Sequence, residues 1–217
     1  MNFVVKDLGA DQCYTEVFKL QQELHAKRVQ GAVEDTLLLL EHSPVYTLGN
    51  SASTDNVIFS EEELAARGID LIRTSRGGDV TYHGPGQLVG YPIVHLGDLG
   101  IKVLEYITAM EEVIIRVAAI YGINAGRDKR NRGVWVGNNK LAAMGIRVSR
   151  QVTMHGFALN VNTQLADYGG IIACGLAGVG VVSMHQLIDS PVDMNEVKSA
   201  VTENFRDVFG YVTAGET

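Results

Sequence analysis

The sequence predicts an α+β fold in which a central mixed or antiparallel sheet is flanked by helices. Short apolar runs typical of strands gather in the middle of the chain, and long segments with helical spacing lie outside them. No linker, internal repeat or low-complexity segment divides the 217 residues, of which 46% are hydrophobic and 20% charged. Because that composition can bury one sizeable core, we expect a single domain over residues 1–217.

The expected strands are short apolar runs, each next to glycine, proline or polar turn residues. They cover residues 2–8, 36–40, 69–73, 88–94, 134–136, 140–148 and 156–161, and residues 42–49 are expected to form a loop and a short strand. The run at 36–40 is continuously apolar, which is typical of a strand buried on both faces. The runs at 134–136 and 140–148 are expected to form a hairpin, because Gly137-Asn138-Asn139 lies between them.

The expected helices have apolar residues at helical spacing and begin or end at recognisable capping residues. They cover residues 11–30, 60–68, 102–121 and 193–209. Ser60 and Glu63 form a capping-box pattern at the second helix, and Asp193 is expected to cap the last one. The segment 102–121 shows the clearest period and is followed by Gly122.

Composition excludes several classes of function. The formal net charge of −7 argues against nonspecific binding of nucleic acid. The longest uncharged apolar run, residues 171–184, is too short to span a bilayer, and the first residues lack the pattern of a signal peptide. With only Cys13 and Cys174, a disulfide framework and a structural zinc site are not expected. A reducing cytoplasm is the natural location for such a chain.

The most informative segment is residues 76–87, Arg-Gly-Gly-Asp-Val-Thr-Tyr-His-Gly-Pro-Gly-Gln. Four glycines in twelve positions indicate backbone that turns sharply or approaches a ligand closely. We expect a polar, glycine-rich loop held between two buried strands, which is a common way to build a site. The alternative is a long hairpin with glycines at its tip, which would not need the polar side chains.

Cys174 and Lys140 are the candidates for chemistry. A lone cysteine is usually an inert core thiol, but Cys174 is followed by Gly175, Gly178 and Gly180, whose backbone N–H groups could face an oxyanion. Cys13 has no such surroundings and is interpreted as structural. A lysine after a tight turn is usually solvated, but one that faces a cleft near a thiol can take its proton. The sequence alone does not place Lys140 beside Cys174.

Other motifs are absent or weak. The histidines show no paired spacing for a metal ligand set, and His83 and His155, each beside glycine at an expected strand end, are better candidates for substrate contact than His95. There is no phosphate-binding P-loop and no dinucleotide-binding glycine motif. We therefore expect no metal and no cofactor.

The segment 76–87 resembles the signature of the octanoyl-(acyl-carrier-protein):protein N-octanoyltransferases. Segments 44–49, 133–148, 155–162 and 174–175 resemble further motifs of this family in the same order, so the resemblance covers nearly the whole chain. One departure is Ala173, where the family usually has proline. The resemblance implies the fold of biotin and lipoate protein ligases and a catalytic dyad of Cys174 and Lys140.

The resemblance also implies the residues that line the acyl site. They are Arg76, Gly77, Gly78, Asp79, Val80, Thr81, Tyr82, His83, Ala143, Met144, Gly145, Gly156, Phe157 and Ala158. The small residues at 143, 145, 156 and 158 are expected to leave room for an alkyl chain.

The implied reaction takes an octanoyl (or lipoyl) group from acyl carrier protein to Cys174 and then to a lysine of a lipoyl domain. The implied acceptors are the lipoyl domains of 2-oxoacid dehydrogenase complexes and the glycine cleavage H protein. The segment 127–132, with four cations in six residues, could attract an acidic carrier protein. Two alternatives stay open: an ATP-dependent lipoate or biotin ligase of the same fold, and a non-catalytic protein that binds acyl groups or lipoyl domains.

Overall fold

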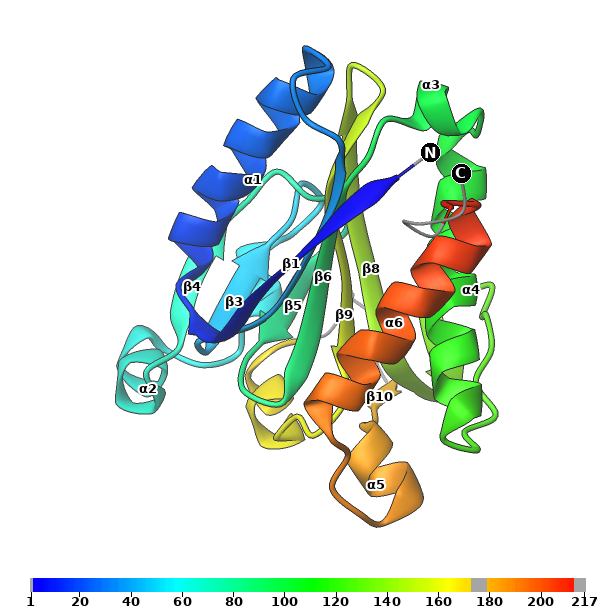
Figure 1. Cartoon of the computed structure of the whole chain (residues 1–217). Helices are drawn as coiled ribbons and strands as arrows, with labels where there is room; N and C mark the ends of the chain where they lie inside the picture. The colour runs from blue at the N-terminus through cyan, green and yellow to red at the C-terminus, as the bar shows by residue number, and fades with distance from the viewer. Residues whose placement is uncertain (1, 173–178, 213–217) are drawn as a thin grey trace.

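The computed structural model describes residues 2–172 and 179–212, and these residues form two sheets with helices on both sides (Figure 1). The larger sheet has seven strands in the order β1-β2-β6-β9-β8-β10, with β7 paired to β8, and the smaller has the order β4-β3-β5. The strands are β1 (Phe3–Gln12), β2 (Asp35–His42), β3 (Val45–Leu48), β4 (Asp70–Arg73), β5 (Val80–His83), β6 (Gln87–Ile93), β7 (Gly133–Val136), β8 (Asn139–Ser149), β9 (Val152–Asn160) and β10 (Gly180–Val181). The α-helices are α1 (Tyr14–Val29), α2 (Glu61–Arg67), α3 (Leu96–Leu99), α4 (Val103–Ile120), α5 (Met184–Ile188) and α6 (Met194–Phe209).

The larger sheet separates two layers of helices, with α1 on one face and α4 and α6 on the other (Figure 1). Strand β2 shows how the sequence builds both layers. Leu37 and Leu39 pack in the cluster of α4 and α6, whereas Leu38 and Leu40 pack in the cluster of α1. The prediction of a strand buried on both faces is therefore confirmed, since successive side chains point to opposite faces. The sheet is mixed, because β1 and β2 are parallel and β2 and β6 antiparallel.

The helix boundaries follow the predicted caps. Ser60 accepts a hydrogen bond from the backbone of Glu63, and the Glu63 carboxylate accepts one from the backbone of Ser60, which confirms the capping box. Asp193 caps α6 as expected, through its bond from the Asn195 backbone at 2.7 Å. Among the helices of residues 2–172 and 179–212, none is long and apolar enough to cross a bilayer.

The smaller sheet corrects the interpretation of residues 76–87 as one loop. Residues 80–83 form strand β5, which pairs antiparallel with β3. Val80 and Tyr82 are buried in a third apolar cluster, with Tyr46 and Leu64. The glycines on both sides dominate the local pattern, but Val-Thr-Tyr-His has the β-branched and aromatic composition of a strand.

Strand β9 begins four residues earlier than the sequence predicts. The connection from β8 to β9 is the two-residue turn Arg150–Gln151, where both residues have positive φ, +50° and +64°. Such turns usually contain glycine or asparagine, so nothing in the sequence marked this one. As a result His155 lies inside β9 and not at a strand end. The expected hairpin at Gly137 is confirmed, with β7 and β8 as its arms.

Candidate functional site

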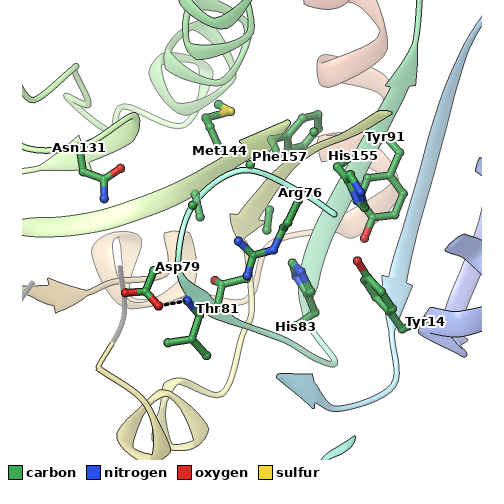
Figure 2. A pocket seen from close by; sticks show the side chains of 16 residues that line it. Tyr14, Arg76, Asp79, Thr81, His83, Tyr91, Asn131, Met144, His155 and Phe157 are labelled. Carbon is green, nitrogen blue, oxygen red and sulfur yellow. Dashed lines mark hydrogen bonds between the residues drawn. The ribbon is translucent and has the colours of Figure 1, made fainter. Parts of the chain in front are cut away.

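A cavity that is partly open to solvent lies where the two sheets meet, between the signature segment, residues 76–87, and the strands β8 and β9 (Figure 2). It holds about 540 Å³ of empty space, part of which is open solvent. Its lining residues are Tyr14, Arg76, Gly78, Asp79, Val80, Thr81, His83, Tyr91, Asn131, Ala143, Met144, Gly145, His155, Gly156, Phe157 and Ala158.

All the residues expected to line an acyl site lie on this cavity except Gly77 and Tyr82. Tyr82 follows the two-residue period of β5: Thr81 and His83 line the cavity, and Tyr82 between them points to the other face. There it packs edge-on against Tyr46 and Tyr168. Gly77 pairs with β8 instead, since its N–H donates to the carbonyl of Ile146 at 3.0 Å.

Three lining residues were missed by sequence reasoning: Tyr14, Tyr91 and Asn131. Tyr14 begins α1 and Tyr91 lies in β6, so both looked like ordinary apolar positions of a helix and a strand. Asn131 lies in the charged segment before β7. The sequence contained no signal for them, because helix α1 and strand β6 approach the cavity only through tertiary packing.

Arg76 is a buried cation that ties the signature segment to β3. Its Nε donates to the Thr47 hydroxyl at 3.0 Å, Nη2 donates to the Thr47 carbonyl, and Nη1 donates to the Gly77 carbonyl at 3.1 Å. A buried charge is tolerated when it is fully hydrogen-bonded. Arg76 therefore shapes one wall of the cavity and leaves a positive charge beneath it.

Three buried imidazoles stay neutral, and two of them, His83 and His155, line the cavity. Burial lowers the pKa of His42 to about 4, and burial together with the positive charges of Arg76 and Arg147 lowers the pKa of His155 to about 3. Burial also lowers the pKa of His83 well below its usual value, helped by His42. No group of metal-ligating side chains occurs among the residues that the structure describes.

The hydrogen bonds of His42 and His83 assign their tautomers. His42 Nδ1 lies 2.9 Å from the Gln12 carbonyl, which can only accept, so Nδ1 carries the proton and Nε2 accepts from the Tyr91 hydroxyl at 2.8 Å. His83 Nδ1 in the same way donates to the Gln87 side-chain oxygen at 2.8 Å. These bonds satisfy both ring nitrogens of His42 and the Nδ1 of His83.

The small residues of β8 and β9 do not all serve the same purpose. At Gly156 a Cβ atom would lie 2.1 Å from the carbonyl oxygen of Gly90, so this glycine is needed for the packing of β9 on β6. At Gly145 a Cβ atom would meet Gly77 O at 3.1 Å and Arg76 Cδ at 3.2 Å. The packing of the neighbouring strand thus already requires glycine at position 156, and the expectation that it leaves room for an alkyl chain stays a prediction.

Lys140 is the second residue of β8 and is buried rather than solvated. Its Nζ donates to the Arg132 carbonyl at 3.3 Å and lies 4.7 Å from the centroid of the Trp135 ring. It lines a smaller hollow next to the main cavity, and the two share Thr81 and Ala143. The other lining residues of this hollow are Asn160, Tyr168, Val179, Gly180 and Val181.

The predicted nucleophile Cys174 lies outside the described residues. The described chain resumes at Val179, and Val181 of β10 pairs with Lys140 of β8. Cys13, interpreted from the sequence as structural, lies at the N-cap of α1 and is exposed, with no capping hydrogen bond from its side chain. A hydrogen bond with Thr15 lowers the pKa of its thiol.

The charged segment 127–132 carries its own counter-ions. Arg130 forms an ion pair with Asp128 at 2.7 Å and packs over the Trp135 ring. Arg127 lies 3.3 Å from the buried Glu111 carboxylate, and Arg132 lies 3.8 Å from it. Glu111 also accepts a hydrogen bond from the Gly133 backbone at 3.0 Å. The positive potential of the segment is therefore weaker than its sequence suggests.

Comparison with known proteins gives close relatives over nearly the whole chain. A family model described as the lipoyl protein ligase A/B catalytic domain matches residues 13–206. The octanoyltransferase of Alkaliphilus metalliredigens is 47% identical over 212 residues, which are 97% of each chain. The octanoyltransferase of Caldicellulosiruptor saccharolyticus is 46% identical over 199 residues, covering 91% of this chain and 85% of its own.

Solved structures share the fold at much lower sequence identity. A bi-partite lipoate protein ligase of Thermoplasma acidophilum, studied with its E2 lipoyl domain, has a TM-score of 0.71 at 15% identity, covering 96% of this chain and 83% of that one. The biotin protein ligase of Aquifex aeolicus, solved with biotin and ATP, has a TM-score of 0.59 at 12% identity, covering 96% and 70%. The expected fold of biotin and lipoate protein ligases is confirmed.

Proposed function

Since this chain belongs to the lipoyl protein ligase A/B catalytic domain family and is an acyltransferase of its octanoyltransferase group, we propose that it carries an octanoyl group on Cys174. The donor in this proposal is octanoyl-acyl carrier protein. The acceptor is a lysine of a lipoyl domain, in 2-oxoacid dehydrogenase complexes or the glycine cleavage H protein. The setting is the cytoplasm, as the two-cysteine sequence suggests.

The observation that carries the proposal is the junction of the main cavity with the hollow of Lys140. The cavity has apolar walls from Val80, Met144, Phe157 and Ala158, which suit an alkyl chain. The hollow has a buried lysine and shares Thr81 and Ala143 with the cavity. An acyl chain in the cavity would therefore present its carbonyl carbon toward Lys140.

The first half of the proposed reaction exchanges one thioester for another. The Cys174 thiol gives its proton to the Lys140 amine, and the thiolate attacks the thioester carbonyl of the donor. The carbon–sulfur bond to the carrier's phosphopantetheine breaks, and that thiolate leaves and takes up the proton from Lys140, which returns the lysine to its neutral form. The step is close to thermoneutral, because a thioester is formed for each one broken.

The second half forms an amide. The amine of the lipoyl-domain lysine attacks the Cys174 thioester, Lys140 accepts the proton of the incoming amine, and Cys174 leaves as the thiolate. The amide is more stable than the thioester, so this half drives the cycle. Neither half needs ATP, because the acyl group arrives already activated.

The surroundings of Lys140 support this role. Its hydrogen bond to the Arg132 carbonyl and its place over the Trp135 ring restrict the side chain. The pairing of Val181 with Lys140 brings the chain that follows Cys174 in sequence to the same hollow. This proximity supports the dyad of Cys174 and Lys140.

Intact-mass measurement after incubation with octanoyl-acyl carrier protein tests the proposal. The transferase should gain one octanoyl group without ATP, and the group should pass to a lipoyl domain added later. An adduct that needs ATP would favour the ligase, and no covalent gain would favour a non-catalytic binder.

Two cysteine variants make the measurement specific. Cys174→Ala should lose both the adduct and turnover, whereas Cys13→Ala should keep both. The second variant matters because Cys13 is exposed and its thiol pKa is lowered, so it can react adventitiously. Turnover by Cys174→Ala would contradict the covalent mechanism.

A further inference from the structure

The main cavity has two chemically different ends. One end meets the hollow of Lys140 at Thr81 and Ala143. The other end is formed by Tyr14, Tyr91 and His155, which lie together on the opposite side of Arg76 from Thr81 (Figure 2). All three of these side chains are buried. We call these three residues the inner wall.

Strand geometry gives the distance from the reacting end to the inner wall. We call the end of the cavity that meets the hollow of Lys140 the reacting end. Ala158 of β9 pairs with Ala143 of β8, so Ala158 lies level with the reacting end. His155 lies three residues before Ala158 on the same strand, which corresponds to roughly 10 Å. Resting on the proposed function, an acyl group whose carbonyl carbon is at Thr81 would point its methyl end at the inner wall. The span is that of a medium-length acyl chain.

The inner wall is held in place by hydrogen bonds as well as by packing. The Tyr14 hydroxyl donates to Thr74 Oγ1 at 3.0 Å, and the Tyr91 hydroxyl bonds His42 Nε2 at 2.8 Å. A chain that pushed these rings aside would break buried hydrogen bonds and leave polar groups unsatisfied. It would also have to deform a close-packed interior.

The surroundings of His155 in the inner wall are polar, which makes them unfavourable for an alkyl chain. His155 has φ of +58°, and its N–H donates to the side chain of Gln21 at 2.9 Å instead of to a strand partner. His155 Nδ1 and Gln21 Nε2 are buried and have no hydrogen-bond partner among the described residues. Phe18, which is half-buried, stacks on His155 at 5.4 Å and on Tyr14 at 6.2 Å.

We propose that the inner wall of Tyr14, Tyr91 and His155 sets the upper limit on acyl-chain length, so that the enzyme accepts medium-chain acyl thioesters and rejects longer ones. Chains shorter than the cavity bury fewer methylenes and bind less well. Chains longer than the cavity meet the buried, hydrogen-bonded rings of Tyr14 and Tyr91. The two effects together give an optimum of chain length rather than a plateau.

The test is the kcat/KM of acyl transfer to a lipoyl domain from a ladder of small acyl thioesters, hexanoyl to dodecanoyl. For the parent enzyme we expect a maximum at octanoyl. Hexanoyl should be roughly tenfold poorer because it buries two fewer methylenes. Decanoyl should be poorer by about tenfold or more, as an apolar site discriminates against surplus methylenes. A profile that stays flat from octanoyl to dodecanoyl overturns the proposal without any variant.

Variants at Tyr14 test whether this ring sets the limit. Tyr14→Ala should raise the ratio of decanoyl to octanoyl kcat/KM by about tenfold or more, because the longer chain can reach the space in front of Phe18. Tyr14→Phe keeps the ring and should keep the parent ratio within a few-fold. If Tyr14→Ala does not fold, Tyr14→Leu gives the same test with a smaller loss of volume.

Tyr211→Ala is the matched control, since it also removes a buried tyrosine ring and its hydrogen bond, here to Asp35, but far from the cavity. Its chain-length profile should equal that of the parent. Equal profiles for Tyr14→Ala and Tyr211→Ala overturn the proposal. A parent enzyme that transfers none of the acyl thioesters contradicts the proposed function itself, and with it the proposal that the inner wall limits chain length.

Discussion

Two groups of cations lie near the site, and they differ in their burial and in the groups that they bind. Arg76 and Lys140 are 7% and 5% exposed and bind backbone carbonyls of Thr47, Gly77 and Arg132. The side chains of Arg127, Arg130 and Arg132 are 39%, 40% and 50% exposed and pair with carboxylates. The first group is fixed inside the protein, and the second is at its surface.

The difference indicates which charges can shape the site and which can only influence how a charged partner approaches it. A buried cation acts on its neighbours: burial is the main cause of the lowered pKa of His155, and the positive charge of Arg76 lowers it further. Exposed ion pairs are screened by solvent and contribute little to stability. We therefore expect variants of the buried cations to have large effects and those of the exposed cations to have small ones.

The largest effect is expected at Lys140. Lys140→Ala should lower the rate of Cys174 acylation by roughly 10²–10⁴-fold, the usual contribution of a positioned acid-base group. Lys140→Arg should not restore it, because arginine does not release its proton near neutral pH. Lys129→Ala removes an exposed cation of the neighbouring segment and should leave the rate unchanged.

Alkylation of Cys174 as a function of pH checks the coupling directly. It should be measured in the Cys13→Ala background, because the exposed Cys13 would otherwise react. Loss of Lys140 should move the alkylation profile to higher pH, since the lysine no longer favours the thiolate. An unchanged profile would show that the two residues are not coupled.

The next largest effect is expected from Arg76→Ala on the free energy of unfolding. The change removes charged donors from Thr47 and Gly77 in a buried place, which should cost about 2–4 kcal/mol. Arg130→Ala removes an exposed cation and should change stability little. Urea denaturation of both variants measures the contrast, and similar losses would show that burial does not distinguish the two cations.

Acid should destabilise the protein through the buried imidazoles. Folding lowers the pKa of His42 to about 4 and of His155 to about 3, so the unfolded chain binds more protons below about pH 6.5. The stabilisation that comes from keeping these imidazoles neutral is therefore fully present above about pH 6.5. It is lost as the pH drops toward the pKa values of the folded state. At pH 5 the loss should be on the order of 2 kcal/mol for each imidazole.

The measurement is urea denaturation at pH 7.5 and pH 5 for the parent and for His42→Asn. The variant keeps a donor toward Gln12 but cannot take up a proton, so its stability should depend less on pH. Equal pH dependence of the two proteins would contradict the assignment of His42 as a buried neutral group.

The smallest effect is expected from reversing Arg130 and Arg132 to glutamate. Because these cations already pair with Asp128 and Glu111, kcat/KM for octanoyl-acyl carrier protein should fall only a few-fold, and mainly at low salt. A small octanoyl thioester without the carrier protein should react as before. Equal losses with both donors would mean that the segment shapes the acyl site.

The sequence by itself determined the features that depend on local pattern. The continuous apolar run Leu37–Leu40, the capping box of Ser60 and Glu63 and the turn at Gly137 are readable because burial period and turn chemistry involve neighbours in the chain. The signature segment is one continuous stretch, so its resemblance to the octanoyltransferase signature could be recognised. That resemblance, and not the local pattern, named its cavity-lining residues in advance, with Tyr82 and Gly77 as the exceptions.

Only the tertiary structure decided which side chains meet across the cavity. Tyr14 comes from α1, Tyr91 from β6 and His155 from β9, and nothing in their local sequences indicates that they form one wall. The burial of Lys140 depends in the same way on Trp135 and on the carbonyl of Arg132. Such contacts arise from strand register and from the packing of helices on the sheet, which join residues far apart in the chain.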